Sequence, residues 1–159
     1  MVMLTGIIAL VIIIADQISK WWMIDLLSSG KITVIDDFFY LTLVYNRGAA
    51  FGIFPGRNIL FIVLSLLTIA ALIFFYRSFF SGSVWARISG GLILGGAVGN
   101  LIDRFRFNYV VDFLDFQFGT YHWPAFNIAD SAICVGVTLL IITVLLTKKP
   151  NHSAGEKDN

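Results

Sequence analysis

The feature that most constrains the fold of this chain is a set of four long apolar runs, with polar residues at the end of the first, at the end of the third and at the start of the fourth. The runs cover about 1–22, 59–76, 84–102 and 128–147. In a bundle of alternating helices, the end of the first run, the end of the third and the start of the fourth lie on one face of a bilayer. These three ends carry Asp16, Lys20, Asn100, Asp103, Arg104, Asn127 and Asp130. Carboxylates in or near hydrocarbon persist mainly where they pair or perform chemistry, so this clustering predicts a functional site.

The composition is that of a membrane protein. Of the 159 residues, 58% are hydrophobic and 13% are charged, and a soluble domain of this size could not bury so much apolar surface. The formal net charge of +1 gives no indication of nucleic-acid binding. The single cysteine, Cys134, excludes an internal disulfide, and we expect it to be a small buried hydrophobic residue rather than a nucleophile.

The lengths of the runs suit membrane-crossing helices. The second, 59–76, would span about 27 Å as a helix, against a hydrocarbon thickness of about 30 Å. The first resembles the apolar part of a signal peptide, but because no small-x-small cleavage site follows it, we expect an uncleaved helix. The third carries Gly91, Gly95 and Gly99 in one stripe, a surface that lets a neighbouring helix pack closely.

The connections indicate how the bundle is oriented. With the N-terminus placed in the cytoplasm, Lys and Arg number five inside and six outside, so the positive-inside rule does not decide the orientation. The connection 77–83 is short, whereas 28–58 and 105–126 are long, which favours an outward-facing site. Within the first long connection, 31–35 and 38–45 read as two strands around an acidic turn and predict a small antiparallel sheet on the membrane surface.

Helical spacing indicates which polar side chains share a face. Gly96, Asn100 and Arg104 recur every four residues on the third helix, and Asn127 and Asp130 open the fourth. Between these helices Val110–Phe116 is expected to form a loop along the membrane surface that carries a carboxylate among bulky apolar residues.

Two carboxylates that converge in a low-dielectric site would support aspartyl-protease chemistry. One pKa rises and the pair shares a proton, so that the ionised acid accepts a proton from water while the protonated acid polarises a carbonyl. Asp130 is one candidate. The other is Asp112 or Asp103, and spacing alone does not choose between them, although Asp103 beside Arg104 has the character of a held structural acid.

Plainer interpretations stand beside this one. Asp16 and Lys20 at i, i+4 predict a structural ion pair, Asp103 would join a helix-end network with Arg104 and Asn100, and Asn127 would only cap the fourth helix. A serine–lysine dyad would need a serine beside Lys20, which no motif places there. Two acids in the 110–116 loop could hold a hard cation. A transporter would be expected to carry polar residues at mid-bilayer, whereas the middles of the first, second and fourth runs are apolar. An assembly protein would use the glycine stripe, but this interpretation leaves the acids without a role.

Five segments form a specific pattern when taken together and in order. They are Asp16-Gln-Ile-Ser-Lys20, Asn46-Arg-Gly-Ala-Ala-Phe-Gly52, Gly95-Gly-Ala-Val-Gly-Asn-Leu-Ile-Asp-Arg104, Val110-Val-Asp-Phe113 and Phe126-Asn-Ile-Ala-Asp130. Over nearly its whole length the chain resembles the lipoprotein signal peptidases (signal peptidase II), bacterial inner-membrane aspartyl peptidases. The resemblance implies an α-helical membrane protein with four transmembrane helices, both termini cytoplasmic, and a small extracytoplasmic antiparallel β-sheet beside a short membrane-surface helix. It implies one peptidase domain over 1–147 and a polar cytoplasmic tail, 148–159.

The resemblance also implies roles for individual residues. The catalytic pair would be Asp112 and Asp130. The substrate-binding or supporting residues would be Asp16, Lys20, Asn46, Gly48, Gly96, Asn100, Asp103, Arg104, Asn127 and Ala129. The implied reaction is water-mediated cleavage of a signal peptide before a diacylglyceryl-modified cysteine, with no metal or organic cofactor. The implied partners are lipid-modified prolipoproteins and membrane lipids, with no nucleic acid, and the enzyme is expected to be a monomer. Gly48–Phe54 is expected to be a mobile surface element over the site.

Overall fold

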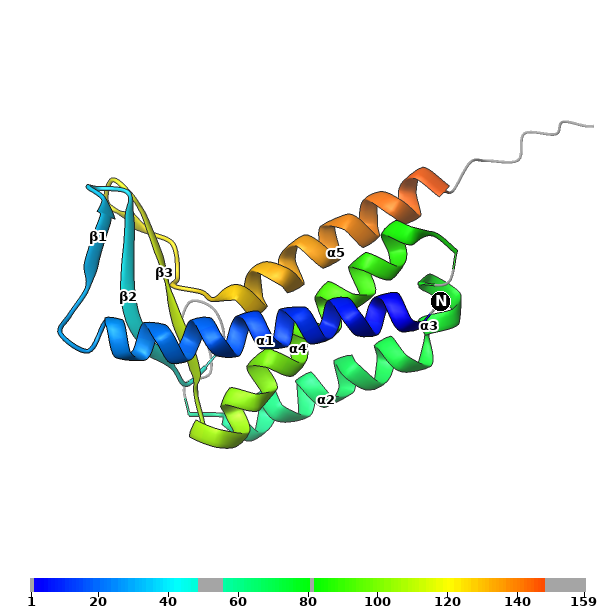
Figure 1. The fold of residues 1–159 in the computed structure, drawn as a ribbon, viewed down its shortest axis with the longest axis horizontal. Helices are drawn as coiled ribbons and strands as arrows, with labels where there is room; N and C mark the ends of the chain where they lie inside the picture. The colour runs from blue at the N-terminus through cyan, green and yellow to red at the C-terminus, as the bar shows by residue number, and fades with distance from the viewer. Residues whose placement is uncertain (1, 49–55, 81, 148–159) are drawn as a thin grey trace, which may run out of the picture.

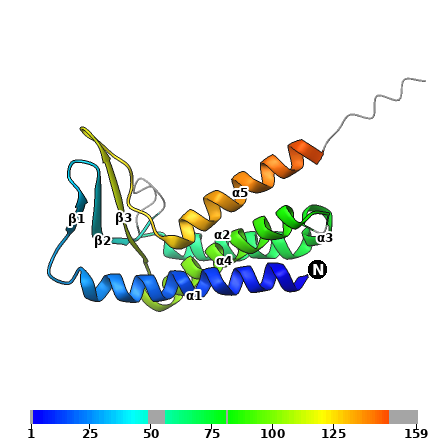
Figure 2. The same cartoon turned by 45° about the horizontal axis from the view of Figure 1, so that its top comes forward.

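Helices form the body of the molecule, and a small sheet stands across one end of them (Figure 1). The computed structural model describes residues 2–48, 56–80 and 82–147. The helices are α1 (Val2–Leu26), α2 (Asn58–Phe74), α3 (Tyr76–Phe79), α4 (Val84–Phe107) and α5 (Ile128–Thr147). The strands are β1 (Ile32–Ile35), β2 (Phe39–Asn46), β3 (Val110–Phe118) and β4 (Tyr121–His122). The start of α1 and the end of α5 both lie at the end of the bundle away from the sheet (Figure 2).

Each predicted apolar run contains a helix, and the largest difference is at the end of α4. This helix continues to Phe107 rather than ending near 102. It ends at Asn108, a left-handed residue (φ 61°) whose backbone N–H donates to the carbonyl of Arg104. At its start, the side chain of Ser83 accepts a hydrogen bond from the N–H of Ala86 at 3.1 Å and caps the helix. Because of this extension, Asp103 and Arg104 lie within the helix rather than beyond its end.

The outward faces of the helices are apolar. By length and hydropathy α1 and the 128–146 part of α5 can each cross a membrane, while α2 is apolar but has only 17 residues. None of the described side chains of α2 is buried, and α1 exposes side chains such as Ile7 and Leu10. Apolar faces of this extent require lipid rather than water around them.

Helix α4 is the central helix and contacts α1, α2 and α5. Its predicted glycine stripe is confirmed as a packing surface against α1. A Cβ on Gly91 would come within 2.7 Å of Ile8 Cβ, and one on Gly95 would come within 2.7 Å of Ile12 Cβ. On another side of the same helix, Gly96 lies against the backbone of Ala129 in α5. The glycines therefore set how closely three helices approach, and they account for the stripe without invoking assembly.

The sheet has the order β1-β2-β3-β4, with every pair antiparallel. The two strands predicted over 31–35 and 38–45 are confirmed as β1 and β2. The loop predicted over Val110–Phe116 is wrong, because this segment forms β3 and pairs with β2, with Val44 opposite Asp112. The first four residues of β3 are all buried, so the strand lacks the alternation of a half-buried strand, and only its β-branched and aromatic residues indicated it.

Two further expectations fall largely on other parts of the chain. The covering element Gly48–Phe54 involves 49–55, and the polar tail is 148–159. Apart from Gly48, these segments lie outside the described residues.

The glycine contacts make a direct prediction. Replacing Gly95 with Ala is expected to lower the free energy of unfolding by about 1–3 kcal/mol, because the new methyl group meets Ile12 Cβ and a backbone oxygen of α1. Gly6 on α1 is the matched control, since a Cβ there has nothing within 4 Å. Thermal unfolding in detergent would compare Gly95→Ala with Gly6→Ala, and equal melting temperatures would contradict this account of the helix contact.

Candidate active site

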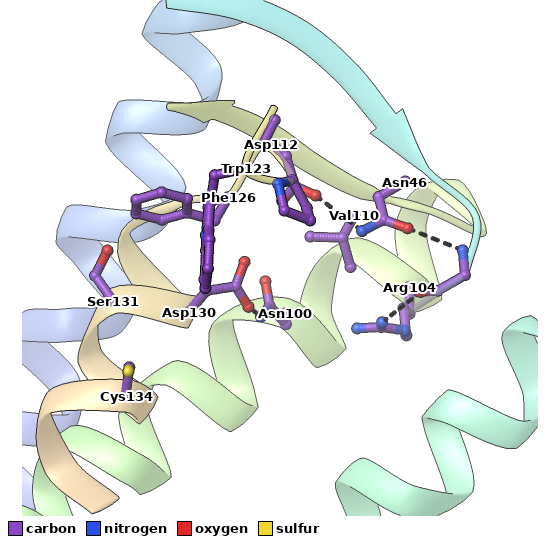
Figure 3. A pocket seen from close by; sticks show the side chains of 13 residues that line it. Asn46, Asn100, Arg104, Val110, Asp112, Trp123, Phe126, Asp130, Ser131 and Cys134 are labelled. Atoms are coloured by element: carbon purple, nitrogen blue, oxygen red, sulfur yellow. Dashed lines mark hydrogen bonds between the residues drawn. The ribbon is translucent and has the colours of Figure 1, made fainter. Parts of the chain in front are cut away.

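Polar side chains from both helices and strands meet where the sheet joins the ends of α1 and α4 and the start of α5 (Figure 3). The prediction that the polar residues of these three helix ends lie together is therefore confirmed. Most of these polar side chains are buried, and every buried side-chain nitrogen or oxygen among the described residues has a hydrogen-bond partner. The site is a closed network of polar groups within an apolar surrounding.

An ionic cluster lies at the base of the site. The ammonium group of Lys20 lies 2.9 Å from Asp16 Oδ2 and 2.9 Å from Asp103 Oδ2. It also donates to Asn100 Oδ1 at 3.0 Å, so its three N–H donors have three acceptors. The predicted Asp16–Lys20 ion pair is confirmed. The expected helix-end network of Asp103 with Asn100 and Arg104 holds in part: Asp103 and Asn100 both contact Lys20 from α1, and among the described residues Arg104 forms no ion pair with Asp103.

Sequence reasoning missed one member of this cluster. The side-chain amide of Gln17 donates to Asp103 Oδ1 at 2.9 Å and to Asp16 Oδ2 at 3.2 Å. Gln17 falls inside the first of the five quoted segments, so its place beside Asp16 was the available signal.

Asp112 projects from β3 and is 1% exposed. Its Oδ1 accepts from Asn127 Nδ2 at 2.7 Å, and its Oδ2 accepts from Asn46 Nδ2 at 2.9 Å. Burial, and then the negative charge of Asp130, raise the pKa of Asp112 to about 7, against the opposing effect of the two amide hydrogen bonds and of the Lys20 charge. A carboxyl group with this pKa changes its protonation near neutral pH.

Asp130 lies in the first turn of α5 and forms a reciprocal cap with Asn127. The backbone N–H of Asp130 donates to Asn127 Oδ1 at 2.9 Å, and the backbone N–H of Asn127 lies 3.4 Å from Asp130 Oδ2. Asp130 Oδ1 accepts from Asn100 Nδ2 at 2.7 Å. The prediction that Asn127 caps the helix is confirmed, but the same side chain also binds Asp112, so capping is not its only contact.

The orientation of each amide group follows from a partner that can only donate. Asn100 Oδ1 faces the ammonium of Lys20, and Asn127 Oδ1 faces the N–H of Asp130. Asn46 Oδ1 accepts from the N–H of Gly48 at 3.0 Å. Because the oxygen of each amide is committed in this way, its NH2 group points at a carboxylate. Both carboxylates, those of Asp112 and Asp130, therefore receive amide donors.

A cavity of about 440 Å³ opens beside these two carboxylates. Its lining includes Asn46, Gly48, Asn100, Arg104, Asp112 and Asp130 together with apolar residues of β3, the 123–126 segment and α5. Arg104 lies with its guanidinium 5.2 Å from the ring centre of Phe61. Asp103 is 1% exposed and is not among the lining residues. Of the two candidate partners for Asp130, the structure thus brings Asp112 to the cavity and Asp103 to the ionic cluster.

Other predicted site residues occupy different positions. Gly96 and Ala129 lie at the contact between α4 and α5, behind the carboxylates, and are not among the lining residues. Cys134 is exposed and lines the cavity, so the prediction that it is buried is wrong. The hydroxyls of Ser19 and Ser131 donate to the backbone carbonyls of Asp16 and Asn127 at 2.8 and 2.9 Å, and in the described part of the chain neither hydroxyl is bonded to Lys20.

Comparison with known proteins gives consistent results. The family described as Signal peptidase (SPase) II matches residues 8–146. A Lipoprotein signal peptidase of Halothermothrix orenii is 50% identical over 138 residues, covering 86% of this chain and 91% of that protein. One of Bacillus pumilus is 44% identical over 144 residues, covering 90% and 93%. A solved structure titled "Bacterial membrane enzyme structure by the in meso method at 2.3 A resolution" superposes with a TM-score of 0.82 at 32% identity, over 96% of this chain and 94% of that one.

The raised pKa of Asp112 predicts a dependence of stability on pH. Between the ordinary value of about 4 and the folded value of about 7, the folded chain binds a proton that the unfolded chain has lost, so stability falls as the pH rises through this interval. Melting temperatures at pH 5 and pH 8 are expected to differ less in Asp112→Asn than in the wild type. An equal pH dependence in both proteins would contradict the assignment.

Proposed function

The chain belongs to the signal peptidase II family, and we propose that it removes signal peptides from diacylglyceryl-modified prolipoproteins by cleaving before the lipidated cysteine. Family membership makes it a membrane-embedded peptidase. The single observation that carries the detailed proposal is the convergence of Asp112 and Asp130 on one cavity. No other Asp or Glu is among the residues described as lining that cavity.

The proposed reaction uses the two carboxyl groups as a pair that holds one proton. The pKa of about 7 for Asp112, raised in part by the charge of Asp130, supports a shared proton near neutral pH. The ionised member accepts a proton from water as the water oxygen attacks the scissile carbonyl carbon. The protonated member donates to the carbonyl oxygen as the tetrahedral intermediate forms.

Collapse of the intermediate completes the proposed cycle. The carbon–nitrogen bond breaks as the amide nitrogen of the lipidated cysteine takes a proton from the pair. One hydroxyl of the intermediate gives its proton to the ionised carboxyl group, and the carbonyl forms again as a carboxylic acid. One water is consumed, and the pair returns to its singly protonated state. The asparagine donors to Asp112 and Asp130 would stabilise whichever carboxyl group is ionised at each step.

The arrangement of the molecule supports an extracytoplasmic site. We propose that α1, α2, α4 and α5 cross the bacterial inner membrane and that the sheet lies outside it. The start of α1 and the end of α5 both lie at the end of the bundle away from the sheet, which would place both in the cytoplasm (Figure 1). A substrate that is itself an apolar helix with a lipid tail would reach the cavity laterally, at the boundary of the hydrocarbon. The chain would work as a monomer, with prolipoproteins and lipids as its partners.

The dyad is tested by replacing each carboxyl group. Asp112→Asn and Asp130→Asn are each expected to lower the cleavage rate by about 10²–10⁴-fold or more, since each removes a proton-transfer group. Asp115→Asn is the matched control, because Asp115 lies on the same strand and is not among the cavity-lining residues. The assay is cleavage of a diacylglyceryl-modified prolipoprotein by detergent-purified enzyme, beside the unlipidated form, with melting temperatures for each variant.

Two outcomes would contradict this proposal. If folded wild-type protein leaves the lipidated substrate intact, the proposed peptidase activity on this substrate is wrong. Loss of cleavage in Asp103→Asn with full activity in Asp112→Asn would mean that the second acid is Asp103.

A further inference from the structure

The ionic cluster of Asp16, Lys20 and Asp103 takes no part in the proton transfers proposed above, yet its three charged side chains are almost completely buried. The three residues are 0%, 3% and 1% exposed. Burying three charged groups is costly unless they pair and hydrogen-bond well, and in this cluster Lys20 contacts both acids and all three of its donors have acceptors.

Each acid of the cluster binds the backbone next to one member of the proposed dyad. Asp103 Oδ2 accepts the backbone N–H of Val111 at 3.1 Å, and Val111 directly precedes Asp112. Asp16 Oδ1 accepts the backbone N–H of Ala129 at 3.0 Å, and Ala129 directly precedes Asp130. Val111 and Ala129 are 1% and 0% exposed, so both hydrogen bonds are shielded from water.

A third connection runs through a side chain. Lys20 donates to Asn100 Oδ1, and because an ammonium group has no acceptor, this contact turns the NH2 group of Asn100 toward Asp130. Lys20 is thus connected to Asp130 through two of its contacts, Asn100 and Asp16. It is connected to Asp112 through a third contact, Asp103.

We propose that Lys20 is a positioning residue for the catalytic pair: it holds Asp16 and Asp103 together, and these acids fix the backbone before Asp112 and before Asp130. The inference rests on the proposed function of that pair. Without the ammonium group, two carboxylates would face one another in a buried space. They would repel or bind a proton between them, and the two backbone contacts would no longer be fixed at one separation.

Lys20 also acts on the pair through its charge. The charged groups that interact with Asp112 are Asp130 from α5, Lys20 from α1 and Arg104 from α4, and the β2 residue that binds it, Asn46, is uncharged. The positive charge of Lys20 lowers the pKa of Asp112 against the larger effect of burial. Removing this charge is therefore expected to shift the titration of Asp112 toward alkaline pH.

The test compares Lys20→Met, which removes the charge, with Lys20→Arg, which keeps it, in the cleavage assay with lipidated prolipoprotein. Lys20→Met is expected to lower kcat by about 10²-fold, the loss typical of a small misplacement of catalytic groups. KM should change little, because Lys20 is not itself among the cavity-lining residues. The pH–rate profile should move toward alkaline pH in Lys20→Met and stay in place in Lys20→Arg.

Thr5→Val is the structural control, since Thr5 is a buried polar residue of the same helix that bonds Tyr76 and the carbonyl of Arg87 at the other end of the bundle. It should lower the melting temperature without moving the pH profile. A folded Lys20→Met with wild-type kcat and pH profile would overturn the inference. So would a profile that moves equally in Lys20→Arg or Thr5→Val.

Failure of the proposed function and failure of this inference have different signatures. If wild type does not cleave the substrate, the function is wrong whatever the variants do. If Lys20→Met does not fold, Asp16→Asn and Asp103→Asn decide the matter, since each weakens one of the two backbone contacts. A reduced kcat at unchanged KM in these variants would support positioning, and wild-type kcat in both would overturn it.

Discussion

The burial of one ammonium group constrains the arrangement of the whole site. Lys20 has almost no contact with solvent, so it requires acceptors for all three of its protons and a compensating negative charge. Asp16 supplies one acceptor from the preceding turn of α1, whereas the other two acceptors, Asp103 and Asn100, come from α4. Because the helices must approach closely for these groups to meet, the glycines of α4 and the ionic cluster depend on each other: a Cβ on Gly99 would lie 2.7 Å from Asp16 Oδ2.

Placing the proposed pair on a strand and on a helix start gives each carboxyl group a different kind of support. Asp130 is held by the cap of α5, where the N-terminal end of the helix favours a negative charge. Asp112 is held by the register of β3 against β2, which sets Val44 opposite it and Asn46 within reach. Asn127 joins the two, since one side chain caps Asp130 and binds Asp112. A change in either element therefore alters the other carboxyl group as well.

The parts of this structure that were predicted from sequence are those governed by local spacing. The i, i+4 pair of Asp16 and Lys20 and the glycine stripe of α4 need only the geometry of one helix. The partner of Lys20 on α4 could not be predicted in this way, because a contact across 80 or more positions depends on packing. Spacing could not decide between Asp103 and Asp112 for the same reason, since the position of Asp112 depends on the pairing of β3. The first residues of this strand are buried on both faces, so its sequence does not show the alternation of polar and apolar residues that indicates a strand. The resemblance to a family supplied what spacing could not.

The chemistry and the stability of the site make opposite demands on Asp112. A carboxyl group that titrates near pH 7 is useful for moving protons at neutral pH, but the burial that raises its pKa also destabilises the folded chain once the group ionises. The surrounding amides partly offset this cost, and they can do so only while their NH2 groups face the carboxylates. Their orientation is fixed by donors such as Lys20 that have no acceptor of their own. A buried cation that is not among the cavity-lining residues thus helps to keep amide donors directed at two acids that face one cavity.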